Sequence, residues 1–184
     1  MIHFYIELFK LVNTMEKILV SACLIGEPVR YDGKSLLQEG DAFKQWQAQQ
    51  RLVMFCPEVA GGLSTPRDPA EIIAHDPSTQ KKPSLDGQGV LTGQARVQTD
   101  SGEDVSQAFI KGAQLALTLC QQHNIQFALL SARSPSCGNE KIYNGQFSGQ
   151  LIDGQGVTAA LLTQHGIHVF NQFQLEELEK ALKA

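Results

Sequence analysis

Short, nearly continuous apolar runs are the clearest pattern in this chain of 184 residues. Four of them stand out, and they cover residues 17–22, 51–55, 125–130 and 167–170. Runs of this length, rich in β-branched and aliphatic residues, are typical of strands that are buried on both faces of a parallel sheet. The pattern therefore predicts four such strands.

Between these runs, apolar residues recur at the spacing of a helix. The clearest helix is predicted over residues 104–122, where Phe109, Ala116 and Cys120 follow a repeat close to 3.6 residues. We expect Asp100 or Ser101 to cap it, because short polar side chains bind the free N–H groups of a first turn. We expect Asn124 to end it.

Shorter helices are predicted over residues 41–50, 156–164 and 172–183. Alternation of strands with helices predicts a doubly wound, mostly parallel α/β sheet of the Rossmann-like kind in a single domain. We expect residues 15–184 to form that domain and residues 1–14 to be an N-terminal extension.

Two polar segments interrupt the alternation. Residues 76–93 are rich in proline and glycine, which predicts a long loop or flap. Residues 144–156 are rich in glycine, which predicts a hairpin or a glycine-rich loop.

Composition narrows the class of protein. Apolar residues make up 42% of the chain and charged residues 18%, which favours a packed core over disorder. The net charge of −4 gives no broad basic surface for a nucleic-acid backbone. With no secretory signal and no apolar run long enough to span a membrane, we expect a cytoplasmic protein without a membrane partner, whose cysteines are reduced.

Three of the four cysteines fall where predicted strands end. Cys23 lies one residue past the first strand, Cys56 directly follows the second, and Cys137 lies in the loop after the third. Ligands of open parallel sheets bind at the carboxyl ends of the strands, so these thiols are expected at the functional edge. Cys120 lies on the apolar face of the predicted long helix and is expected in the core.

Thiolates are soft ligands that select zinc, copper(I) or iron–sulfur clusters. The chain lacks the paired Cys-x-x-Cys spacing that is typical of zinc sites, and its histidines lie outside the cysteine loops. Three dispersed thiolates suit a cubane cluster with one open iron, which would act as a Lewis acid. Spacing alone leaves a second interpretation open, in which the thiols are buried or redox-active and bind no metal.

The sequence around these cysteines resembles the 2-thiouracil desulfurase family. The resemblance runs from residue 18 to residue 169 and rests on four segments: ILVSACLIGEPVRYDG at 18–33, FCPEVAGGLSTPRDPAEI at 55–72, SARSPSCGNEKIYNGQFSG at 131–149 and GQGVTAALL at 154–162. Two positions depart from the family pattern: Asn144 replaces an expected acidic residue, and Ala132 replaces a common lysine.

The resemblance implies an α/β fold and an oxygen-sensitive 4Fe-4S cluster bound by Cys23, Cys56 and Cys137. It also implies that Glu58 is the acid–base residue and that Ser134 is a catalytic serine in the pocket. The competing interpretations are an ion pair or cap for Glu58 and loop capping for Ser134.

Three further residues are candidates for substrate binding. Arg67 and Arg133 each lie within a quoted segment and could bind an anion or neutralise the negative charge of the cluster. Ser136 has a hydroxyl that could bind a substrate ring or a cluster sulfide. Surface solvation and loop capping are the alternatives for these side chains.

The resulting hypothesis is iron–sulfur-dependent, hydrolytic desulfuration of 2-thiouracil-type bases to uracil and hydrogen sulfide. The thione sulfur would bind the open iron, and Glu58 would activate the attacking water. The expected partner is a thiolated nucleobase, with a thiolated nucleoside or RNA as alternatives; the sequence gives no oligomeric state. Two other functions remain open: an iron–sulfur or thiol enzyme for another sulfur compound, and a redox or metal-sensing protein.

Overall fold

The computed structural model of the protein describes residues 15–74 and 84–183. The predicted N-terminal extension, residues 1–14, lies outside the described residues. So do residues 76–83 of the predicted 76–93 loop.

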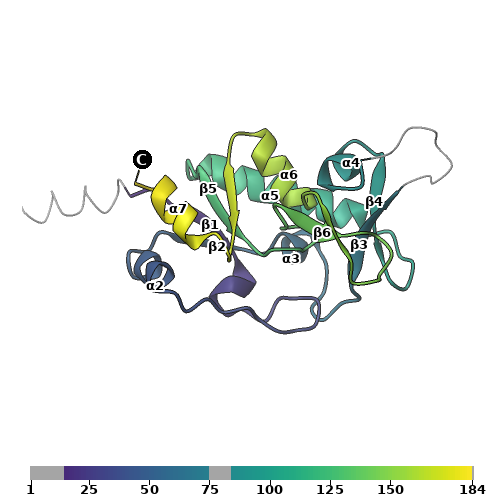
Figure 1. The fold of residues 1–184 in the computed structure, drawn as a ribbon, viewed down its shortest axis with the longest axis horizontal. Coiled ribbons are helices and arrows are strands. Elements are labelled where there is room, and N and C mark those ends of the chain that lie inside the picture. The colour runs from purple at the N-terminus through teal and green to yellow at the C-terminus, as the bar shows by residue number, and fades with distance from the viewer. Residues whose placement is uncertain (1–14, 75–83, 184) are drawn as a thin grey trace, which may run out of the picture.

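Four parallel strands form the central sheet, in the order β2-β1-β5-β8 (Figure 1). Their bounds are Ile18–Ser21 for β1, Leu52–Phe55 for β2, Phe127–Leu130 for β5 and His168–Asn171 for β8. Each strand begins and ends within two residues of one predicted apolar run. The prediction of a parallel α/β sheet is confirmed.

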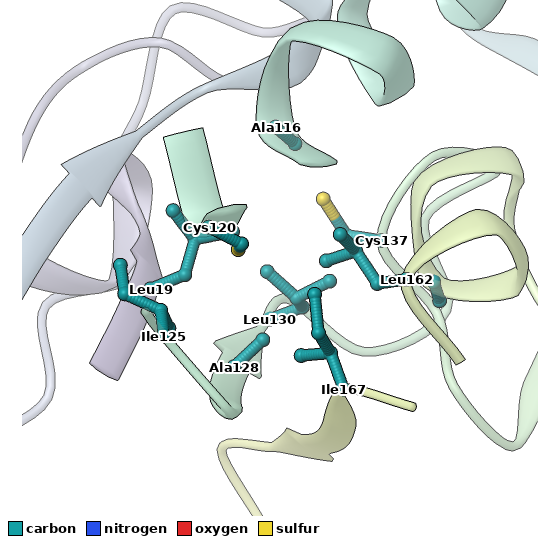
Figure 2. Packing of buried hydrophobic residues seen from close by; sticks show 10 residues of the cluster. Leu19, Ala116, Cys120, Ile125, Ala128, Leu130, Cys137, Leu162 and Ile167 are labelled. Atoms are coloured by element: carbon teal, nitrogen blue, oxygen red, sulfur yellow. The ribbon is translucent and has the colours of Figure 1, made fainter. Parts of the chain in front are cut away.

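Helices cover both faces of this sheet, as the doubly wound prediction requires (Figure 1). On one face, Leu19 and Leu130 pack with Cys120 and Leu162 (Figure 2). Cys120 belongs to α5 (Ser106–Gln122), and Leu162 belongs to α6 (Val157–Gln164). Cys120 is therefore in the core, as predicted.

The opposite face is covered by α2 (Asp41–Ala48) and α7 (Leu175–Ala181). Ile18 and Val20 point to this side, because successive side chains of a strand alternate between faces. They pack with aromatic and aliphatic residues of the two helices: Phe43, Trp46 and Leu178.

The long helix begins later than predicted. It starts at Ser106, and the carboxylate of Asp104 accepts hydrogen bonds from the backbone N–H and the hydroxyl of Ser106 at 3.0 and 2.6 Å. Asp100 and Ser101 do not cap it; they form the turn after β4 (Ala95–Thr99). The chain leaves the helix through Asn124, whose φ of 51° ends the helical path.

Two antiparallel pairs flank the parallel sheet. One pairs β3 (Ala70–Ala74) with β4, and the other pairs β6 (Lys141–Tyr143) with β7 (Leu151–Asp153). The second pair confirms the predicted hairpin, whereas the first was not predicted. Together with α5 and α6, the two pairs enclose a third group of buried residues, which includes Val97, Phe109, Ile142 and Val157.

The prediction of a loop throughout 76–93 is wrong for Gly87–Leu91, which form α4. Asp86 caps this helix, since its carboxylate accepts a hydrogen bond from the backbone N–H of Gly89 at 3.0 Å. The glycines that suggest a loop serve close packing instead: a Cβ atom on Gly87 would lie 2.4 Å from the carbonyl oxygen of Gly156. Across the part of the chain that the structure describes, no helix is long and apolar enough to cross a membrane.

Candidate functional site

The three cysteines follow three adjacent strands of the sheet. Cys23 lies in the short 3-10 helix η1 (Ala22–Ile25) after β1, Cys56 precedes α3 (Pro57–Gly61) after β2, and Cys137 lies in the loop after β5. Strand β1 pairs in parallel with both β2 and β5, so the three carboxyl ends lie side by side. All three cysteines line one pocket of about 1150 Å³.

The thiols of this pocket are free and poorly hydrated. Cys23 and Cys137 are buried, Cys56 is half-buried, and none forms a disulfide. Burial raises the pKa of each thiol, and the negative charge of Glu58 raises the pKa of all three further. Without a metal the three therefore stay protonated, and a bound cation would have to stabilise their thiolates.

This arrangement of thiols fits a polynuclear cluster. Within residues 15–74 and 84–183, no three His, Cys, Asp or Glu side chains form a group that could hold a metal ion. A cubane spreads its ligands over different iron atoms, so its cysteines stand farther apart than those of a mononuclear site. Three cysteines that line one pocket from three different strand ends agree with that spread.

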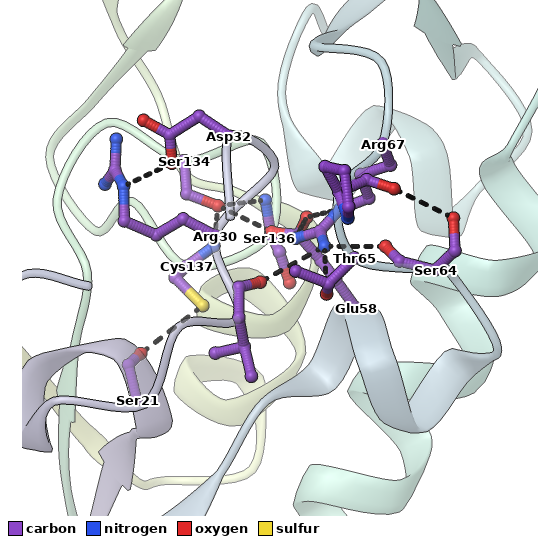
Figure 3. Close-up of polar contacts among 12 residues, drawn as sticks. Ser21, Arg30, Asp32, Glu58, Ser64, Thr65, Arg67, Ser134, Ser136 and Cys137 are labelled. Atoms are coloured by element: carbon purple, nitrogen blue, oxygen red, sulfur yellow. Dashed lines mark hydrogen bonds and ion pairs between the residues drawn. The ribbon is translucent and has the colours of Figure 1, made fainter. Parts of the chain in front are cut away.

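Glu58 lies in the first turn of α3, two residues after Cys56, and its carboxylate is held from both sides (Figure 3). Its Oε2 accepts hydrogen bonds from Nε and Nη2 of Arg67 at 3.0 and 2.6 Å. Its Oε1 accepts a hydrogen bond from the hydroxyl of Ser134 at 3.2 Å. The carboxylate is only 15% exposed and lines the same pocket as the cysteines.

Ser134 connects this carboxylate to the loop of Cys137. While its hydroxyl donates to Glu58, its oxygen accepts hydrogen bonds from the backbone N–H groups of Ser136 and Cys137 at 3.0 and 3.2 Å. One donor and two acceptor sites are all that a serine hydroxyl has. Ser134 therefore orients Glu58 relative to Cys137.

Arg67 reaches the site as the partner of Glu58. Its Nη1 donates to the carbonyl oxygens of Val29 and Ser64 at 3.1 and 3.0 Å and to the hydroxyl of Thr65 at 3.3 Å. The guanidinium thus directs its hydrogen bonds at protein groups, and the side chain is 11% exposed. Its predicted contact with substrate stays a prediction, while its contact with Glu58 is the ion pair that the sequence left open as the competing interpretation of that carboxylate.

The other two candidates for substrate binding, Arg133 and Ser136, differ in whether they line the pocket. Arg133 is exposed, lines the pocket and places its guanidinium over the ring of Phe173, 5.8 Å from the centroid. Ser136 is fully buried, and its hydroxyl pairs with that of Thr158 at 2.9 Å. Ser136 is not among the residues that line the pocket, so the structure separates it from the other candidates.

Two serines at the site were not predicted. Ser21 ends β1, and its hydroxyl donates a hydrogen bond to Sγ of Cys137 at 3.6 Å while accepting one from the backbone N–H of Ser131 at 3.0 Å. Ser131 directly follows β5, and both serines line the pocket. The sequence signal that could have identified Ser21 and Ser131 is that each is a polar residue at the end of an apolar strand, on the edge of the sheet where the cysteines gather.

The two departures from the family pattern lie outside the hydrogen-bond network of Glu58. Asn144 lies in the turn between β6 and β7, where its side-chain oxygen accepts hydrogen bonds from Gln146 and Ser148. Ala132 lines the pocket, and Gln172 accepts a hydrogen bond from its backbone N–H at 2.8 Å. Neither substitution alters the residues that hold Glu58.

Comparison with known proteins agrees with this site. An uncharacterized protein of Bacillus subtilis (strain 168), YbbK, is 42% identical over 161 residues, which cover 88% of this chain and 99% of that protein. A solved [4Fe-4S]-dependent thiouracil desulfidase, TudS, is 48% identical with a TM-score of 0.77, and the match covers 91% of this chain and 98% of that one. The sequence model of 2-thiouracil desulfurase matches residues 18–174, a span that includes every cysteine and the whole Glu58 network. The chain therefore belongs to the 2-thiouracil desulfurase family.

Proposed function

We propose that this protein hydrolyses 2-thiouracil-type bases to uracil and hydrogen sulfide with a [4Fe-4S] cluster held by Cys23, Cys56 and Cys137. The observation that carries the proposal is that three cysteines and one oriented carboxylate line a single pocket. A similar chain of known structure is described as [4Fe-4S]-dependent and as a thiouracil desulfidase. Four free cysteines also fit the predicted cytoplasmic location.

Three protein thiolates leave one corner of a cubane without a protein ligand. When bound, the cluster supplies at that corner an electron-poor iron that attracts sulfur and polarises a carbon–sulfur bond.

Glu58 supplies the proton transfers. Its carboxylate accepts a proton from water as the water oxygen attacks the carbon that carries sulfur, and it returns that proton to the departing sulfur. The overall reaction consumes one base and one water and releases one uracil and one hydrogen sulfide, so no external electrons are required. Arg67 and Ser134 keep the carboxylate in one orientation during both transfers.

The pocket has room for more than a base. Small-molecule sites commonly measure about 300–1000 Å³, and this pocket, at about 1150 Å³, is larger than that range. Arg133 and Phe173 line it on the exposed side. A thiolated nucleoside is therefore included with the free base among the substrates to be tested.

Anaerobic purification tests the proposal directly. We expect a brown protein with matched iron and sulfide contents that converts 2-thiouracil to uracil and sulfide. A panel of thiolated bases, nucleosides and RNA would rank the substrates. A protein that cannot be reconstituted with iron and sulfide would overturn the cluster, and a loaded protein that turns over no member of the panel would overturn the reaction.

A further inference from the structure

The contact between Ser21 and Cys137 joins two of the strands that build the site. The two residues are 116 positions apart, and the distance from the serine oxygen to the cysteine sulfur is 3.6 Å. Ser21 is 3% exposed and Cys137 is 4% exposed, so bulk water does not compete for either group. Figure 3 shows the Ser21 hydroxyl pointing at this sulfur.

The direction of this hydrogen bond follows from the other partner of the hydroxyl. The backbone N–H of Ser131 donates to the oxygen of Ser21 at 3.0 Å. An N–H group can only donate, so the single proton of the hydroxyl remains for Cys137. Parallel pairing of β1 with β5 holds the three groups in this order.

We propose that Ser21 is a positioning residue that withdraws electron density from the Cys137 thiolate and thereby raises the reduction potential of the cluster. The inference rests on the proposed function, because it requires a cluster at these cysteines. Hydrogen bonds to ligand sulfurs stabilise the more negative, reduced state of an iron–sulfur cluster. The same withdrawal of charge leaves the irons more electron-poor, which suits a site that uses iron as a Lewis acid.

Substitution of Ser21 tests the inference by a measurement other than activity. In Ser21→Ala, we expect the ratio of oxidised to reduced cluster at a fixed potential to rise about tenfold, a shift of about 59 mV for a one-electron couple. Ser21→Thr keeps a hydroxyl and should return the potential toward that of the wild type. Thr158→Val is the matched control, because it removes a buried hydroxyl that bonds Ser136 and no cysteine.

The outcomes separate this inference from the proposed function. A wild-type protein that binds no cluster overturns the function. A loaded Ser21→Ala protein with an unchanged potential, or a Thr158→Val protein with the same shift, overturns the role of Ser21 alone. Should Ser21→Ala fail to assemble a cluster, resonance Raman spectra of the wild type serve instead: we expect the Fe–S(Cys) stretching bands to move in D₂O, and unmoved bands overturn the inference.

Discussion

Ser134 donates its hydroxyl proton to Oε1 of Glu58 over 3.2 Å, although 76 positions separate the two residues. The same serine oxygen is bound to the backbone N–H of Cys137, so the carboxylate and a cysteine of the pocket share one support. The direction of Glu58 is therefore set by the loop after β5 as well as by its own helix. A reaction that needs a proton-transferring carboxylate and a thiolate at one place benefits when a single residue, here Ser134, positions both.

Replacement of Glu58 by Gln should abolish turnover and leave the cluster in place. The amide keeps the size of the side chain but cannot accept a proton from water, and the loss of a general base typically costs 10²–10⁴-fold in rate. The measurement is 2-thiouracil turnover together with iron content. A variant that loses its iron would assign Glu58 a structural role.

Replacement of Arg67 by Met should lower kcat and leave KM nearly unchanged. The guanidinium directs its hydrogen bonds at Glu58 and at groups of the chain, so its removal disorders the carboxylate without removing a substrate contact. Loss of this charged pair should also reduce the free energy of unfolding by about 3 kcal/mol. A raised KM with an unchanged kcat would instead support the predicted contact with substrate.

Individual replacement of Cys23, Cys56 or Cys137 by Ala should prevent cluster assembly, whereas Cys120→Ala should retain it. Cys120 packs in the core between α5 and the sheet (Figure 2). Its truncation is expected to cost about 1 kcal/mol of stability. Iron content and visible absorbance of the four variants check this, and an iron-free Cys120→Ala protein of normal stability would contradict the assignment.

Cys120 should also make the cluster-free protein less stable at high pH. Burial raises the pKa of its thiol from 9.0 to about 11. Above pH 9 the unfolded chain loses this proton and the folded protein keeps it, so the stability contributed by the folded thiol falls as the pH rises from 9 toward 11. Denaturant unfolding of wild type and Cys120→Ala across that range isolates the effect, and parallel curves would refute it.

Gly112→Ala should disturb the site from a distance. A Cβ atom there would lie 2.0 Å from the carbonyl oxygen of Pro57, the first residue of α3. Relief of this clash must displace α3 and with it Cys56 and Glu58. We expect a stability loss of about 2 kcal/mol and a lower iron content. Gly40→Ala is the control, because its Cβ would meet only Leu175 at 3.5 Å; an equal loss of iron in both variants would argue against the mechanism.

The sequence predicted the parallel strands well because each is a short apolar run; β1 and β5 are buried along their whole length, whereas the outer strands β2 and β8 are partly exposed. It missed β4, although the buried Ala95, Val97 and Thr99 alternate with partly buried positions in the period-2 pattern of a strand. It misread α4, because close packing requires glycines there and the same residues suggest a loop.

The parts of the candidate site that depend on local sequence, such as a cysteine directly after a strand, could be predicted. The positions of the cysteines at strand ends indicated that they gather, and the structure brings them to one pocket. The partners of Arg67 and the contact from Ser21 to Cys137 depend on loops far apart in the sequence. Spacing along a chain carries no information about such contacts.

The strand order β2-β1-β5 also decides when the protein can mature during synthesis. Cys23 and Cys56 leave the ribosome early, but Cys137 joins them only after β5 has been made and has paired with β1. Long-range pairing of this kind is slow relative to local structure. A truncated or nascent chain therefore presents Cys23 and Cys56 without Cys137, and the proposed cluster site is complete only after the sheet has folded.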